Sequence, residues 1–122
     1  MSKTLPIVLV EDDMWLAEQF TRTLGDYIVH HAPHALAAID LIDEVKPAAI
    51  ILDVLLTGAT AFTLLHELQS YTDTAMVPII LCTNMATELQ LEELESYGVR
   101  RILDKATMRP DDLIAAVRSV TI

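Results

Sequence analysis

The sequence contains a single cysteine, few basic residues and no long apolar run. Cys82 has no second cysteine to pair with, which excludes an internal disulfide and favours a reducing compartment. Eight Lys and Arg stand against 18 Asp and Glu, so the formal net charge is −10 and direct contact with nucleic acid or an anionic membrane is not expected. No apolar segment reaches the length of a membrane span, and the N-terminal apolar run is too short for a signal peptide. We therefore expect a cytoplasmic protein.

The length and the apolar content suit one compact domain. The chain has 122 residues, 52% of them apolar, and we see no repeat or linker, so we expect a single domain over residues 1–122. Short, mostly apolar segments rich in β-branched residues alternate with helical patterns. The expected strands are IVLV (7–10), YIVHH (27–31), AAIIL (48–52), VPIILC (77–82) and VRRIL (99–103). Helices are expected over about 14–24, 35–45, 60–70 and 87–98, and from Pro110 onward.

Capping signals support the helix boundaries. Pro47 stops the second helix, Thr87 and Gln90 form a capping-box pattern at the start of the fourth, and Gly98 suits its end. Five strands alternating with five helices predict an α/β fold with a doubly wound parallel sheet, because right-handed crossovers place helices on both faces. Ligands of such sheets bind at the carboxyl ends of the strands.

Acidic residues stand at two of these strand ends. Glu11, Asp12 and Asp13 follow the first strand, and Asp53 follows the third, within the apolar run IILDVLLTG. A charge in such a run is costly unless it is paired, hydrated or ligated, and crowded carboxylates repel unless a cation lies among them. Carboxylate oxygens suit Mg²⁺, which keeps some of its waters and also binds phosphate oxygens. Asp13 is the one of the first three acids that is better explained as the start of a helix.

Thr83 and Lys105 add a hydroxyl and an ammonium to the same edge, after the fourth and fifth strands. An ammonium and a metal neutralise phosphoryl charge, and a hydroxyl donates a hydrogen bond to it. A carboxylate can act as the nucleophile by forming an aspartyl phosphate, and Asp53, at the end of the central strand, is the best placed.

These motifs resemble the response regulator receiver domains of two-component signalling. The resemblance covers essentially the whole chain and rests on VLVEDD, IILDVLLTG, VPIILCTN and RILDKA, each after a predicted strand. It implies the flavodoxin-like (βα)5 receiver fold with strand order 2-1-3-4-5. It also implies a switch that takes a phosphoryl group from a histidine kinase, catalyses only its own phosphorylation and dephosphorylation, and changes the face formed by its fourth helix, fifth strand and fifth helix.

The resemblance assigns a role to each matching residue. Asp53 is similar to the phosphoacceptor, with Thr83 and Lys105 contacting the phosphoryl group. The Mg²⁺ ligands that it implies are Glu11, Asp12, Asp53 and the backbone carbonyl of Leu55. The implied partners are a sensor histidine kinase or a phosphotransfer protein, together with an output protein or domain that the sequence does not identify. A phosphorylation-dependent homodimer is a further arrangement that the family allows.

Several positions depart from the family pattern. Ala106 follows Lys105 where the family has a proline in a cis peptide, so we expect either a trans bond with a rebuilt loop or a strained cis bond. Ile102 stands where an aromatic ring is usual, and Thr57 replaces a proline. These changes motivate a second hypothesis, a phosphorylation-independent protein-binding module. A third, an aspartyl phosphatase, is weaker because Leu55 stands where such enzymes carry a second aspartate.

Other residues have simpler interpretations. The histidines of HHAPH (30–34) invite a metal site, but His30 and His31 are adjacent on a strand and point to opposite faces. Cys82 is expected to be a buried apolar residue, and Leu91 to lie off the apolar stripe of its helix, exposed to a partner.

Overall fold

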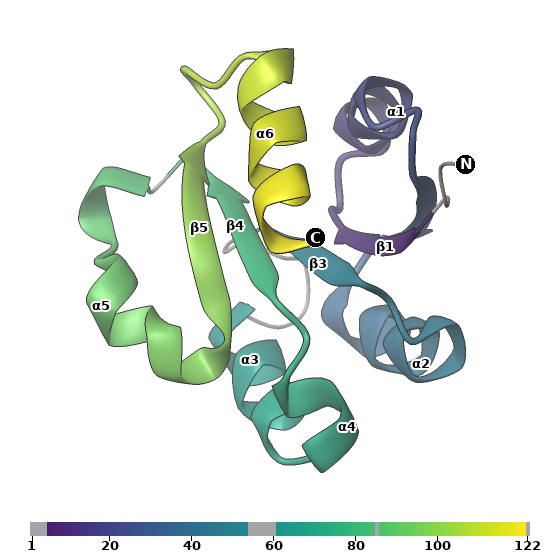
Figure 1. Ribbon diagram of the computed structural model, residues 1–122, viewed down its shortest axis with the longest axis vertical. Helices are drawn as coiled ribbons and strands as arrows, with labels where there is room; N and C mark the ends of the chain where they lie inside the picture. Colours follow the sequence, from purple (N-terminus) through teal and green to yellow (C-terminus); the bar gives the residue numbers. More distant parts are fainter. Residues whose placement is uncertain (1–4, 54–60, 85, 122) are drawn as a thin grey trace.

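The computed structural model describes residues 5–53, 61–84 and 86–121, and these residues form a parallel sheet covered by helices on both faces (Figure 1). The sheet has five strands in the order β2-β1-β3-β4-β5, and every pair of neighbours is parallel. The strands are β1 (Pro6–Val10), β2 (Ile28–Ala32), β3 (Ala49–Leu52), β4 (Ile79–Thr83) and β5 (Val99–Asp104). Both the doubly wound α/β fold and the strand order predicted from the sequence are confirmed.

Helices follow the strands and pack in two layers. The α-helices are α1 (Met14–Thr23), α2 (Ala35–Val45), α3 (Ala61–Gln69), α4 (Thr72–Ala75), α5 (Leu91–Leu94) and α6 (Pro110–Val120). Two 3₁₀ turns, Ala86–Glu88 and Glu95–Tyr97, flank α5. Figure 1 shows α1 and α6 on one side of the sheet and α2 and α3 on the other.

Each face of the sheet has its own hydrophobic core, because side chains alternate between the faces along every strand. Ile7, Leu9, Ile51, Ile80 and Cys82 pack against α1 and α6. Val8, Ile50, Leu52 and Leu81 and their neighbours pack against α2, α3 and α5. Every residue of β3 and β4 is buried, which explains why these strands read as continuous apolar runs in the sequence.

The segment from residue 87 to residue 98 is not the continuous helix that the sequence predicted. The α-helical part begins after Gln90, whose backbone is extended and whose side chain makes no capping hydrogen bond, so the predicted capping box is wrong. Leu89 and Leu91 both pack against the core. A helix would turn residues two apart by about 200° from each other, whereas the extended backbone at Gln90 lets both side chains reach the sheet. Leu91 is therefore half-buried rather than an exposed partner contact.

Two further features concern the helices. The sequence did not predict α4, a single turn held by Thr74 Oγ1, which donates to the carbonyl of Leu68 at 2.6 Å. The helical segment ends at Gly98 as predicted, with φ of 88° in the left-handed region. No helix within the described residues is long and apolar enough to cross a membrane.

Candidate functional site

The carboxyl ends of the parallel strands meet at one edge of the sheet and bring the predicted site residues together. Val10 and Leu52 are register partners at the ends of β1 and β3, so the residues that follow them, Glu11 and Asp53, are neighbours. The Asp53 N–H continues the ladder by donating to the Val10 carbonyl at 3.2 Å. Sequence reasoning had placed these residues at strand ends, and the register brings them to the same point.

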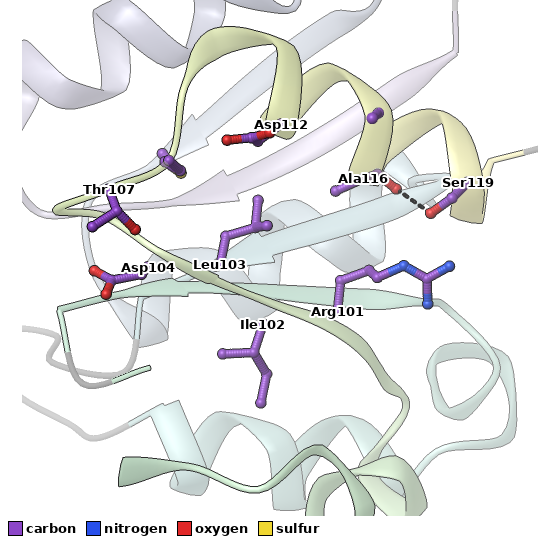
Figure 2. A pocket seen from close by; sticks show the side chains of 10 residues that line it. Arg101, Ile102, Leu103, Asp104, Thr107, Asp112, Ala116 and Ser119 are labelled. Carbon is purple, nitrogen blue, oxygen red and sulfur yellow. Dashed lines mark hydrogen bonds between the residues drawn. The ribbon is translucent and has the colours of Figure 1, made fainter. Parts of the chain in front are cut away.

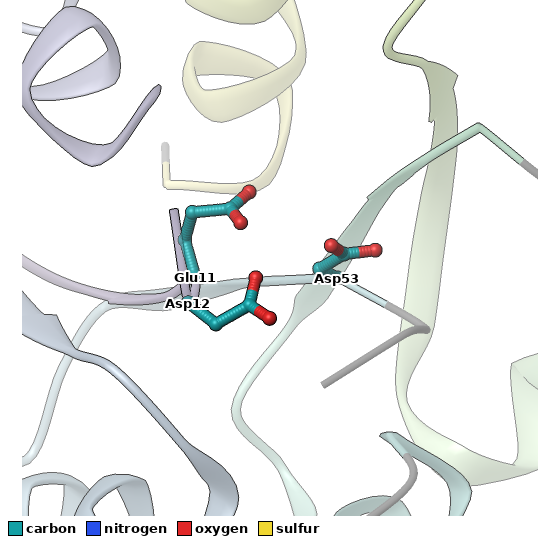
Figure 3. Close-up of side chains that lie close together, drawn as sticks. All are labelled: Glu11, Asp12 and Asp53. Carbon is teal, nitrogen blue, oxygen red and sulfur yellow. The ribbon is translucent and has the colours of Figure 1, made fainter. Parts of the chain in front are cut away.

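Three carboxylates form the acidic cluster, which we define as Glu11, Asp12 and Asp53 (Figure 3). One oxygen from each carboxylate lies within 4.8 Å of those of the other two. Glu11 and Asp53 are buried, whereas Asp12 is exposed, so the cluster has an inner side against the sheet and an outer side open to water. Hard oxygen donors that converge beside solvent suit a divalent cation that keeps part of its hydration shell. The residues present therefore fit a Mg²⁺ ion.

Lys105 reaches the same cluster from the end of β5. Its Nζ donates to Asp53 Oδ2 at 2.8 Å and to Glu11 Oε1 at 2.5 Å. The described peptide bonds include no cis bond, so Ala106 follows Lys105 through a trans peptide, and its N–H donates to the Asp104 carboxylate at 2.9 Å. The absence of the family's proline therefore does not prevent the ammonium from reaching Asp53.

Burial and ion pairing shift the pKa values of Glu11 and Lys105. Burial raises the pKa of Glu11 above its ordinary value, although the hydrogen bond from Lys105 opposes the shift. Burial alone would lower the pKa of Lys105, but its hydrogen bonds and its attraction to Asp53 and Glu11 together raise it. Lys105 is therefore a cation at neutral pH, and it neutralises part of the charge of the acidic cluster.

Thr83 and Cys82 are adjacent on β4 and differ in their contacts and in their chemistry. Thr83 is fully buried at the end of β4, and its carbonyl accepts the Lys105 N–H at 3.1 Å, so β4 and β5 are tied together beside the cluster. Cys82 points into the core under α1 and α6, as the sequence predicted. Burial raises the pKa of its thiol to about 12, which makes it a poor nucleophile.

The remaining residues singled out in the sequence have structural partners. Asp13 caps α1 by accepting from the N–H groups of Trp15 and Leu16, as predicted. The indole of Trp15 is exposed. His34 caps α2, accepting from the Ala37 N–H at 3.2 Å. Leu55 lies outside the described residues.

His31 is a residue whose contact the sequence reasoning missed. Its Nε2 lies 2.6 Å from the carbonyl oxygen of Glu11. The signal was present, because a residue near the end of β2 must lie beside the end of β1 once the two strands are parallel neighbours.

A separate pocket of about 490 Å³ lies between β5 and α6 (Figure 2). The side chains of Arg101 and Leu103 point from β5 towards α6, whereas the side chain of Ile102 points to the opposite side of β5. Ile102 is half-buried and packs against the α2–α3 core, where the family has an aromatic ring. None of the three carboxylates lines this pocket, so it is distinct from the acidic cluster.

Comparisons with known proteins agree with this architecture. The sequence profile of the family described as response regulator receiver domain matches residues 7–118. The receiver domain of RstA from Klebsiella pneumoniae, in its BeF3-activated form, is 28% identical with a TM-score of 0.79, covering 95% of this chain and 97% of that one. CheY4 of Vibrio cholerae is 21% identical with a TM-score of 0.86, covering 97% and 99%. A sensor protein from Polaromonas sp. JS666 is 21% identical with a TM-score of 0.89, covering 98% and 97%. Comparison with curated protein sequences finds no match.

The parallel sheet and its carboxylate edge define a doubly wound α/β domain with an acidic site at its strand ends, and the family match makes the assignment specific. The chain belongs to the response regulator receiver family. Receiver domains are regulatory domains of two-component signalling rather than conventional enzymes. They interact with histidine kinases or phosphotransfer proteins and typically use a divalent metal.

Proposed function

We propose that the chain is a phosphorylation switch in which Asp53 accepts a phosphoryl group from a phosphohistidine of a sensor histidine kinase or phosphotransfer protein. The observation that carries this proposal is the position of Lys105 Nζ, 2.8 Å from the Asp53 carboxylate, beside the acidic cluster. A buried carboxylate that shares one ammonium with Glu11 and has Asp12 on its exposed side is arranged for an anionic group that arrives together with a cation.

Mg²⁺ is the proposed cofactor of this site. Glu11, Asp12 and Asp53 would hold it through carboxylate oxygens, and the backbone carbonyl of Leu55 is proposed as a further ligand. When bound, the ion supplies positive charge that offsets the charge of the phosphoryl oxygens. Without a cation the site would place a phosphoryl dianion beside three carboxylates, with only one ammonium to compensate.

In the proposed step, a carboxylate oxygen of Asp53 attacks the phosphorus atom. The new P–O bond forms as the P–N bond of the phosphohistidine breaks, and the imidazole leaves with the electron pair and takes up a proton. Lys105 and Thr83 are the groups that we propose contact the transferred phosphoryl oxygens. Water later hydrolyses the acyl phosphate and restores the Asp53 carboxylate.

The proposed output is a change in the surface built from α5, β5 and α6, which controls a partner protein or an output domain. We propose that residues 1–122 form a single receiver domain, and that a phosphorylation-dependent homodimer is one form of its output. Ile102 occupies the position of the usual aromatic ring on β5 and packs against the core, so this chain would transmit the change without a rotating ring.

A small phosphodonor provides the test. The protein is incubated with acetyl phosphate and Mg²⁺ and its intact mass is measured. We expect a phosphoryl adduct that is absent after Asp53→Ala and after chelation of Mg²⁺. Asp40→Ala, which removes an exposed carboxylate from α2, is the matched control and should keep the adduct.

The second candidate function is a phosphorylation-independent binding module, which Ile102 and Ala106 favour. Beryllium fluoride, the activating group of the RstA relative, separates the two. The amide signals of the protein are recorded by NMR before and after beryllium fluoride and Mg²⁺ are added. If these signals do not change, and no phosphodonor gives an adduct, the phosphorylation-switch hypothesis is wrong and the binding module is supported.

A further inference from the structure

We propose that His31 is a positioning residue for the metal-binding carboxylates, because it holds the peptide that joins Glu11 to Asp12. This inference rests on the proposed Mg²⁺ site and assigns a role to a histidine outside the acidic cluster.

The hydrogen bond between His31 and Glu11 is short, and only His31 can be its donor. His31 Nε2 lies 2.6 Å from the Glu11 carbonyl oxygen, and a carbonyl can only accept, so Nε2 carries the hydrogen and donates. His31 is half-buried, and its register partner on β1 is Leu9, whose side chain packs under α1 and α6. The imidazole is therefore held on the same side of the sheet as that core.

The end of β2 explains why a side chain makes this contact. Glu11 N–H donates to the Ala32 carbonyl at 3.1 Å, which extends the β1–β2 ladder beyond Val10. β2 ends at Ala32, and the chain bends at residues 33 and 34 to begin α2. A parallel ladder that continued would supply a backbone N–H to the Glu11 carbonyl. The imidazole of His31 donates in its place.

The backbone on both sides of Asp12 is held as a result. His31 fixes the carbonyl of the peptide before Asp12, and the planarity of that peptide fixes the direction of the Asp12 N–H. On the other side, the Asp13 N–H donates to Glu11 Oε2 at 3.1 Å. Asp12 is the exposed member of the cluster, so these two hydrogen bonds fix the backbone from which its carboxylate meets the cation. Partners of this kind, behind the ligands, commonly set metal affinity.

The test compares three variants of the whole chain by calorimetric titration with Mg²⁺ and by urea unfolding. His31→Leu removes the donor, and we expect Mg²⁺ to bind about 10-fold more weakly. His31→Gln keeps an N–H donor at a similar reach and should restore most of the affinity. His30→Leu removes the neighbouring imidazole, which points to the opposite face, and should bind Mg²⁺ as the unaltered protein does.

Several results would overturn the assignment. If His31→Leu loses stability but binds Mg²⁺ normally, the contact is only structural. If His31→Gln binds as weakly as His31→Leu, the donor is not what matters. If His31→Leu does not fold, the imidazole ¹⁵N resonances of the unaltered protein decide, because Nε2 without a hydrogen excludes the contact. Should the unaltered protein bind no Mg²⁺, the proposed function itself fails, and this inference with it.

Discussion

Lys105 Nζ lies 2.8 Å from Asp53 Oδ2, although the two residues are 52 positions apart in the sequence. Both side chains are about 10% exposed, so the ion pair forms where water screens it poorly. The same ammonium also contacts Glu11, which makes one cation the shared partner of two buried carboxylates.

Replacing Lys105 should destabilise the fold as well as the site. Lys105→Met leaves Glu11 and Asp53 buried without their cation, and removing one member of a buried ion pair costs about 3 kcal/mol. We expect the free energy of unfolding in urea at neutral pH to fall by that order. Adding Glu11→Gln to Lys105→Met should recover part of the lost stability, because it removes one of the two buried carboxylate charges that Lys105 neutralises. An unchanged unfolding midpoint in Lys105→Met would contradict the pairing.

Trp15 should report the binding of Mg²⁺. It lies three residues after Asp12, and its backbone N–H donates to Asp13 Oδ1 at 2.9 Å. The Asp13 N–H in turn donates to Glu11 Oε2, and these two hydrogen bonds tie the start of α1 to the acidic cluster. We expect the tryptophan emission to change as Mg²⁺ is titrated into the unaltered protein. The Asp12→Asn variant should show a response only at much higher concentrations of Mg²⁺. A flat titration in the unaltered protein would mean that Trp15 does not sense the site.

Cys82 should make stability depend on alkaline pH. Burial raises the pKa of its thiol from 9.0 to about 12 in the folded state. The unfolded chain therefore releases this proton first, so the stability that the neutral thiol contributes is complete below pH 9 and is lost as the pH rises towards 12. The free energy of unfolding should fall less steeply above pH 9 in Cys82→Ala than in the unaltered protein. Equal slopes in the two proteins would show that the thiol is not protected by burial.

Of the two glycines that the structure describes, Gly98 should tolerate substitution less well than Gly25. Its φ of 88° is strained for any residue with a Cβ, and an added Cβ would lie 3.3 Å from the Val77 carbonyl oxygen. We expect Gly98→Ala to cost about 1–2 kcal/mol in thermal or urea unfolding. Gly25→Ala is the matched control, because its Cβ would meet only the Arg22 carbonyl, at an ordinary 3.6 Å. Similar losses in both variants would contradict this explanation.

Much of the fold could be predicted because local and tertiary preferences agree along most of the chain. β3 and β4 are buried at every position, so their burial produces continuous apolar runs that are visible without any structure. The segment around Gln90 could not be predicted in the same way. A capping pattern favoured a helix from Thr87, but the packing of both Leu89 and Leu91 on the core requires an extended residue between them.

The candidate site was predictable to the level of strand ends. Parallel strands must carry their final residues to one edge, so Glu11, Asp12, Asp53 and Lys105 were expected there from the order of the motifs. Whether Lys105 would reach Asp53 past Ala106 could not be decided, because the reach of a side chain depends on the path of the loop that carries it. The strand order did place His31 beside the end of β1, but its contact was overlooked because the sequence does not reveal which carbonyl there lacks a ladder donor.

The sequence by itself determined the type of domain, the strands and the residues at their ends, because apolar periodicity and the position of charges are local properties of the chain. Only the tertiary structure decided which of those charges meet. The ion pairs of Lys105, the hydrogen bond of His31 and the break at Gln90 each depend on strand register and on burial in a shared core. Those are set by contacts between residues far apart in the sequence, which no local pattern encodes.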